Sequence, residues 1–134
     1  MKLLRIKETC LYVSDLEATR SFYEDKLGLP LISLVPGRHV FFRAGESVLL
    51  CFDPEVTRHD KKLPPHWGQG NLHLAFECDP DAYAAWKKKV KQAGIPILQE
   101  AEWTRGLRSF YFSDPDGHLL EIVQQGIWEP QQDS

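Results

Sequence analysis

Three residues in this sequence have side chains that could bind a metal ion and lie within expected strands. Glu121 lies within the otherwise apolar segment Leu119–Val123, and a carboxylate there is costly to bury unless it is paired or bound to a metal. His73 and Glu8 each lie near the start of another expected strand. Carboxylate and imidazole ligands suit a divalent ion such as Mn, Fe, Ni, Co or Zn. The residue types therefore predict a metal site of Glu8, His73 and Glu121.

Each of these residues also has an ordinary structural interpretation. His73 could be a histidine whose hydrogen bonds are satisfied in the core or at the surface, and Glu8 could be a solvent-facing strand residue. Glu121 could instead pair with an arginine, for which the candidates are Arg38, Arg105 and Arg108. The residue types alone leave these alternatives open.

The segments that would position these side chains follow the same order twice. Alternating apolar residues predict strands over 6–14, 29–35, 38–43 and 47–52, and again over 71–78, 95–100, 107–113 and 118–124. Helical spacing predicts a helix after the first strand of each set, ended by Gly28 and by Gly94. This internal repeat predicts an α+β fold of two βαβββ modules, residues 5–53 and 71–124, in one domain of 134 residues.

Residues 54–70 connect the two modules. They are polar and contain Pro64-Pro65, Gly68 and Gly70. Plain connections are rarely this long, so the segment is expected to be either a linker or a functional loop. The tail at 125–134 is also polar, and it is expected to lie on the surface or fray.

Side chains alternate between the two faces of a strand, which sorts the polar residues. In the strand at 71–78, the residues expected to pack under the helices are Leu72, Leu74 and Phe76, and the opposite, open face carries His73, Ala75 and Glu77. The equivalent open face of the first strand carries Glu8, Cys10 and Tyr12. His73 and Glu8 are thus expected at corresponding positions of the repeat.

Composition and charge exclude several classes of partner. The net charge of −3 gives no reason to expect nucleic acid as a partner. No apolar run approaches the roughly 20 residues needed to cross a membrane, and the start is too short and polar for a signal peptide. Cys10, Cys51 and Cys78 lie in apolar runs without a CxxC motif. They are expected to be buried free thiols of a cytoplasmic protein.

Several motifs together resemble the vicinal oxygen chelate superfamily, which includes glyoxalase I, methylmalonyl-CoA epimerase, extradiol dioxygenases, fosfomycin resistance proteins and bleomycin-binding proteins. The motifs are Leu11-Tyr-Val-Ser-Asp-Leu16 with Phe22-Tyr23 and Leu27-Gly28-Leu29; Leu72-His-Leu-Ala-Phe76; and Tyr111-Phe-Ser-Asp-Pro-Asp-Gly117 with Leu120-Glu121. The chain is most similar to uncharacterised glyoxalase-like bacterial proteins, on Pro64-Pro-His-Trp67 and Glu102-Trp-Thr-Arg-Gly106.

The resemblance implies an open, cup-shaped mixed sheet with the helices outside and the site within. It implies Glu8, His73 and Glu121 as metal ligands, with Glu8 in place of the family's usual histidine. The fourth, acidic ligand of glyoxalase I falls here at Leu49 or Leu50, neither of which can bind metal. The candidates for contacting substrate are His66, Trp103, Ser109 and Tyr111, with Arg105 and Arg108 more typical of the surface.

The resulting expectation is a divalent-metal-dependent lyase or isomerase of the glyoxalase type. It would act on a small oxygen-chelating substrate through a metal-stabilised enolate, with Glu8 and Glu121 as the catalytic carboxylates. An extradiol-type dioxygenase, or a non-catalytic binding or resistance protein, are the alternatives. A homodimer is expected, because open sheet edges need covering and because resembling proteins are mostly dimers.

Overall fold

The computed structural model describes residues 1–130. The contacts within the chain separate it into two compact units, Met1–Asn71 and Leu72–Ser134. The first unit contains β1 (Glu8–Tyr12), α1 (Leu16–Arg20), the π-helical η1 (Ser21–Lys26), β2 (Leu31–Val35), β3 (His39–Ala44), β4 (Ser47–Phe52) and α2 (Pro54–Thr57). The second contains β5 (His73–Cys78), η2 (Pro80–Ala82), α3 (Tyr83–Gln92), β6 (Gln99–Glu102), η3 (Thr104–Gly106), β7 (Arg108–Ser113) and β8 (Leu119–Gln124).

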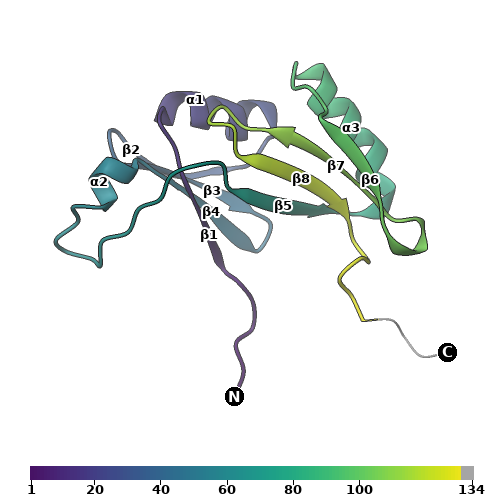
Figure 1. The fold of residues 1–134 in the computed structure, drawn as a ribbon, viewed down its shortest axis with the longest axis horizontal. Coiled ribbons are helices and arrows are strands. Elements are labelled where there is room, and N and C mark those ends of the chain that lie inside the picture. The colour runs from purple at the N-terminus through teal and green to yellow at the C-terminus, as the bar shows by residue number, and fades with distance from the viewer. Residues whose placement is uncertain (131–134) are drawn as a thin grey trace. The chain divides into compact units, whose positions relative to one another are not determined.

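Each unit has one mixed four-stranded sheet, and the strand orders correspond (Figure 1). The orders are β1-β4-β3-β2 and β5-β8-β7-β6, with one parallel pair in each sheet. The predicted α+β architecture of two βαβββ modules is therefore confirmed.

The two parallel pairs also have the same register. Glu8, the first residue of β1, lies opposite Val48, and His73, the first residue of β5, lies opposite Leu119. Two residues further along, Cys10 lies opposite Leu50 and Ala75 lies opposite Glu121. Glu8 and His73 are therefore equivalent in the repeat, and Leu50 is the equivalent of Glu121.

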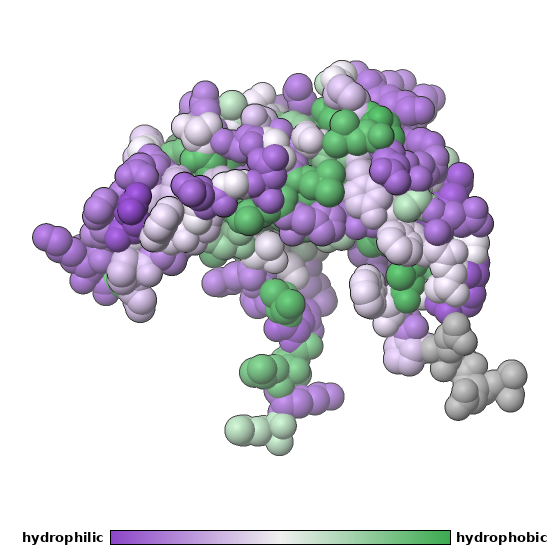
Figure 2. Space-filling view, in the orientation of Figure 1, coloured by the Kyte–Doolittle hydropathy of each residue, from purple (hydrophilic) through white to green (hydrophobic). Residues whose placement is uncertain are grey.

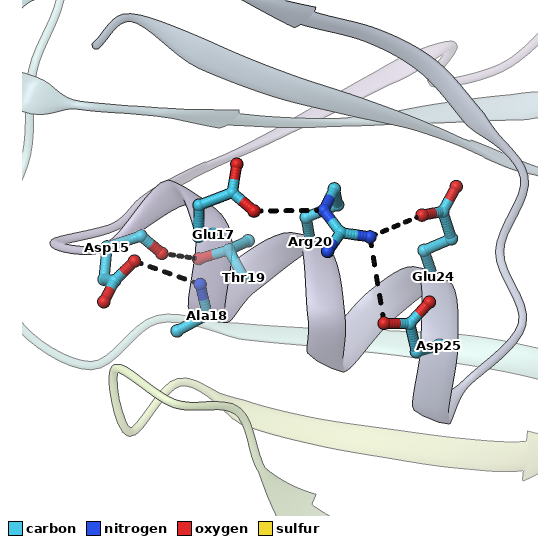
Figure 3. A network of polar contacts seen from close by, with 7 residues as sticks. All are labelled: Asp15, Glu17, Ala18, Thr19, Arg20, Glu24 and Asp25. Atoms are coloured by element: carbon cyan, nitrogen blue, oxygen red, sulfur yellow. Dashed lines mark hydrogen bonds and ion pairs between the residues drawn. The ribbon is translucent and has the colours of Figure 1, made fainter. Parts of the chain in front are cut away.

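The first helical segment begins with a side-chain cap (Figure 3). The carboxylate of Asp15 accepts a hydrogen bond from the Ala18 amide at 3.0 Å, which satisfies one of the free N–H groups of the first turn. Arg20 then pairs with Glu24 at 2.8 Å along the outer side of the helix. Gly28 follows with φ +81°, the left-handed conformation expected for a glycine that ends a helix.

The core of the second unit lies between α3 and one face of its sheet. Phe110, Phe112 and Leu120 are fully buried on that face. The ring of Tyr83 on α3 packs edge-on against Phe110, with centroids 5.5 Å apart. Figure 1 shows α3 running along this side of the sheet. The opposite face is left for the polar residues of β5, β7 and β8.

The strand predicted at 95–100 begins later than expected, at Gln99. Pro96 has no amide hydrogen to donate, so it cannot contribute a ladder hydrogen bond. Ile95 instead ends the helical segment, because its amide donates to Val90 O at 3.2 Å. Pairing with β7 starts where the amide of Leu98 donates to Tyr111 O at 2.8 Å.

The connection at 54–70 is packed against the first unit. It begins with α2, which the sequence analysis missed, although Asp53 before Pro54 is a typical cap and first-turn pair. Asp60 pairs with Arg38 at 2.8 Å, and the amide of His66 donates to Thr57 O at 3.2 Å. These contacts favour an ordered loop over a free linker.

The segment before β1 exposes its hydrophobic side chains, as Figure 2 shows near the N-terminus; they include Leu3, Leu4 and Ile6. No helix within residues 1–130 is long and apolar enough to span a membrane.

The three cysteines are free thiols, and burial raises the pKa of Cys10 and of Cys78 above the usual range. Of the predicted tail, residues 131–134 lie outside the described residues.

Candidate metal centre

His73 and Glu121 lie side by side on the parallel strands β5 and β8. The Nε2 atom of His73 is 3.4 Å from the Oε1 atom of Glu121. The imidazole is half exposed, with 49% of its side-chain surface accessible, whereas the carboxylate is largely buried at 10%. The structure thus brings together two of the three ligands predicted from the sequence.

The second nitrogen of His73 defines which atom of the ring faces Glu121. Nδ1 lies 2.9 Å from the backbone oxygen of Leu119. Because a carbonyl oxygen can only accept a hydrogen bond, Nδ1 must carry the hydrogen and donate it. In the neutral ring, Nε2 therefore has a lone pair, and this atom lies 3.4 Å from the carboxylate oxygen Oε1.

Two lone-pair donors this close together can share a positive charge placed between them. A proton on Nε2 would supply this charge, and so would a divalent cation bound by both atoms. Histidines that bind metals commonly donate their other N–H to a backbone carbonyl, as His73 does. The donor set and the fixed ring therefore fit a divalent ion.

Tyr111 lies beside Glu121 on the neighbouring strand. The two residues are direct partners in the antiparallel β7–β8 pair. Burial raises the pKa of the Tyr111 hydroxyl; a hydrogen bond with Ser109 lowers it in part, and the charge and hydrogen bond of Glu121 raise it further. The hydroxyl thus keeps its proton at neutral pH and can donate to the carboxylate.

Two further candidate residues continue this line of polar contacts. The indole N–H of Trp103 donates to the hydroxyl of Ser109 at 2.9 Å. Ser109 is fully buried, whereas 45% of the Trp103 surface is exposed. We call Trp103, Ser109, Tyr111, Glu121 and His73 the polar row, because Trp103 bonds Ser109 and the other four follow one another along β7, β8 and β5. Its four strand residues lie on the side of the sheet opposite the Phe110 and Phe112 core.

Glu8 lies in the other unit, exposed at the first position of β1. Its register matches that of His73, as the repeat predicted. Within residues 1–130, no group of three or more His, Cys, Asp and Glu side chains is gathered so that it could hold a metal ion. The role of Glu8 as the third ligand therefore stays a prediction.

The arginine interpretation of Glu121 is not what the structure shows. Arg38 pairs with Asp60, Arg108 pairs with Glu100 at 3.2 Å, and the Arg105 guanidinium donates to the backbone oxygen of Gly126. In the part of the chain that the structure describes, the basic side chain within ion-pair distance of Glu121 is His73.

His66 belongs to a separate cluster in the first unit. Its Nδ1 atom is 2.7 Å from the hydroxyl of Tyr12, and its ring packs edge-on against Phe52 at 4.8 Å. Strand alternation predicts Tyr12 on the same face as Glu8 but indicates no role for it. Its contact with His66 could not be foreseen, because it depends on the path of the 54–70 connection.

A comparison with known proteins now places these features in a family. The Glyoxalase/Bleomycin resistance protein/Dioxygenase superfamily model matches residues 5–122, which span both sheets. The chain belongs to this superfamily. The resemblance noted from the sequence motifs is thereby confirmed, and the match includes the three predicted ligand positions.

Relatives within the superfamily carry different activities in their names. Metallothiol transferase FosB of Bacillus licheniformis is 30% identical over 129 residues, covering 96% of this chain and 80% of that protein. Lactoylglutathione lyase of Neisseria meningitidis is 27% identical, covering 91% of each chain. The crystal structure of a lactoylglutathione lyase from Agrobacterium tumefaciens is 33% identical, with a TM-score of 0.90, covering 97% of this chain and 100% of the other.

Proposed function

We propose that this protein is a divalent-metal-dependent enzyme acting on a small molecule, with His73 and Glu121 as ligands and Glu8 as the third. The observation that carries the proposal is the pair of lone-pair donors, Nε2 and Oε1, which lie 3.4 Å apart with the ring held by Leu119 O. The name metallothiol transferase, given to relatives of the chain, supports a metal as well.

A bound divalent ion would act as a Lewis acid on neighbouring oxygens of a substrate. The protein's own side chains would do the rest. Burial of Glu121 keeps water from one side of its carboxylate, and Tyr111 can donate a hydrogen bond to that carboxylate and hold its orientation. Glu8 is the proposed base that accepts a proton from the substrate carbon, because it is exposed and is the non-standard member of the set.

The proposed reaction class is that of a glyoxalase-type lyase or isomerase. Support comes from the lactoylglutathione lyase relatives, including the structure with a TM-score of 0.90. Leu50 at the position equivalent to Glu121 leaves a three-ligand set, in which open positions can accept a chelating substrate. The proposed substrate is therefore a small molecule with two adjacent oxygens.

Thiol transfer to a small electrophile is a second candidate. It is favoured by the 30% identity with metallothiol transferase FosB and the 31% identity with glutathione transferase FosA of Serratia marcescens. The two reactions differ in the fate of the thiol: an isomerase leaves it in a thioester, from which a separate hydrolysis returns free thiol, whereas a transferase leaves it in a stable thioether.

Turnover of metal-loaded protein tests both candidates. The protein is stripped with chelator, reloaded separately with Mn, Fe, Ni, Co or Zn, and supplied with a 2-oxoaldehyde plus thiol or with an epoxide plus thiol. Isomerase activity with the oxoaldehyde, lost on chelation and in Glu8→Gln, supports the main proposal. Irreversible thiol loss only with the epoxide supports the second, and activity that survives complete metal removal contradicts both.

The homodimer also remains a proposal. Each sheet has two edge strands, β1 and β2 in one and β5 and β6 in the other, and exposed strand edges need covering. Light scattering of the purified protein tests it: a mass of twice the 15.4 kDa chain supports a dimer, and a monomer mass contradicts it.

A further inference from the structure

The loop between β6 and β7 holds one residue in a backbone conformation that its type disfavours. Arg105 has φ 58° and ψ 29°, whereas every other residue of positive φ among residues 1–130 is a glycine. The left-handed region crowds a Cβ atom, so a non-glycine residue stays there only when its surroundings hold it. The contacts of Arg105 therefore need an explanation.

The loop from Trp103 to Leu107 contacts the turn that follows β8. The Arg105 guanidinium donates to the backbone oxygen of Gly126. Leu107 reaches the same turn, since a Cβ on Gly126 would lie 3.0 Å from its Cδ1 atom. The loop is closed on itself as well, because the amide of Trp103 donates to Leu107 O at 2.7 Å. We call the Arg105–Gly126 contact the latch.

Trp103 begins this loop and is also the outer end of the polar row. Its indole N–H is fixed on the buried Ser109 hydroxyl at 2.9 Å, while nearly half of its surface is exposed. The indole is thus a flat apolar surface that remains open to other molecules. Its orientation depends on the Ser109 hydrogen bond and on the path of the loop from Trp103 to Leu107.

We propose that Arg105 is a positioning residue that, through the latch, holds the Trp103 indole as a fixed surface for an apolar or planar part of the substrate. The proposal rests on the proposed function and narrows its substrate class. The molecule would carry adjacent oxygens at one end and an apolar or aromatic arm at the other. A methyl-sized arm would gain little from the indole, whereas an aromatic arm would stack on it.

Two substitutions separate positioning from simple support of the fold. Arg105→Gly and Arg105→Asn both accept a positive φ and both remove the guanidinium. Simple support of the fold predicts lower thermal stability in both variants, because the contact with Gly126 O is lost, whereas a positioning role predicts little change. Arg105→Lys keeps a charged donor at the same position, and it is the conservative variant that should restore the latch in part.

The first readout is independent of activity. Hydrogen exchange of the Trp103 indole N–H is measured in the full chain by NMR, with the resonance assigned through Trp103→Phe. We expect exchange to be about tenfold faster in Arg105→Gly and Arg105→Asn, because local opening becomes easier. Arg105→Lys should lie between these variants and the wild type.

The second readout uses metal-loaded enzyme and paired substrates with a methyl or a phenyl arm. In Arg105→Gly, KM for the phenyl substrate should rise several-fold, with kcat and metal affinity unchanged and KM for the methyl substrate unaffected. Unchanged indole exchange, or equal KM changes for both substrates, overturns the proposal. If the wild type binds no metal and turns over nothing, the proposed function fails, while indole exchange still decides whether the latch holds Trp103.

Discussion

At the scale of single residues, the proposed metal site depends on the orientation of the His73 ring. The hydrogen bond to Leu119 O fixes one nitrogen as a donor and turns the other toward a buried carboxylate. The residue types predicted that His73 and Glu121 are ligands, but the ring orientation could not be predicted from them. It arises from the β5–β8 register, which places Leu119 directly opposite His73.

Removing the Tyr111 hydroxyl should weaken metal binding without unfolding the protein. In Tyr111→Phe, Glu121 loses its neighbouring donor, and loss of such an outer contact typically lowers metal affinity by about 10- to 100-fold. The matched control is Tyr83→Phe, since the Tyr83 hydroxyl bonds Glu100 at 2.7 Å on the α3 side. Titration with Zn should show weaker binding only in Tyr111→Phe. Equal Zn affinities in the two variants would contradict a role of the Tyr111 hydroxyl in supporting Glu121.

His39 should make stability fall on mild acidification. It is buried, and burial together with the charge of Arg38 lowers the pKa of its imidazole in the folded protein. Below about pH 6.5, His39 binds a proton in the unfolded chain but not in the folded chain. The free energy of unfolding therefore falls, by at most about 1.4 kcal/mol per pH unit. This loss ends once the pH falls below the lowered pKa. In urea unfolding, the stability of His39→Phe should depend less on pH than that of the wild type. An identical pH dependence would contradict the prediction.

At the scale of elements, short sequence patterns such as helix-ending glycines and alternating apolar residues predict the repeat. Gly28 and Gly94 end their helical segments with φ +81° and +80°, as predicted. The Ser47–Phe52 strand has the predicted bounds. The start of β6 was predicted too early, because Pro96 cannot donate a ladder hydrogen bond. The helix α2 was not predicted, because it is too short to show a helical period.

The cap of α1 is the element most easily tested. Asp15→Ala removes the acceptor of the Ala18 amide, and loss of such a cap costs about 1 kcal/mol of unfolding free energy. Glu17→Gln is the control, because Glu17 makes an exposed ion pair with Arg20 at 3.3 Å, and such pairs contribute less. Denaturant unfolding monitored by circular dichroism should separate the two variants, and equal losses would argue against the cap.

At the scale of the whole molecule, the chain duplicates one architecture and then differentiates the copies chemically. His73 and Glu121 occupy one parallel strand pair, and Glu8 and Leu50 occupy the same positions of the other. The sequence predicted this asymmetry with Leu49 or Leu50 as the substituted position, and the register selects Leu50. The Trp103 loop and the Tyr12–His66 contact could not be predicted, because they depend on irregular segments with no repeating pattern.

Metal should stabilise the whole chain if its ligands form a site only in the folded state. A free ion at about 100 times its dissociation constant should add about 2.7 kcal/mol to the unfolding free energy. Thermal unfolding with added Zn or Ni should shift upward in the wild type and in the exposed-residue control His59→Ala. The shift should be smaller in Glu8→Gln if Glu8 is the third ligand, and an undiminished shift would exclude it.

The most direct test of the central claim is the metal content and affinity of the His73→Ala variant. Protein purified without chelator is analysed for metals and titrated by calorimetry, alongside wild type and His59→Ala. We expect one divalent ion per chain in wild type and His59→Ala, and an affinity at least about 100-fold weaker in His73→Ala. A wild type that takes up no divalent ion, or a His73→Ala variant that binds it equally well, would contradict the assignment.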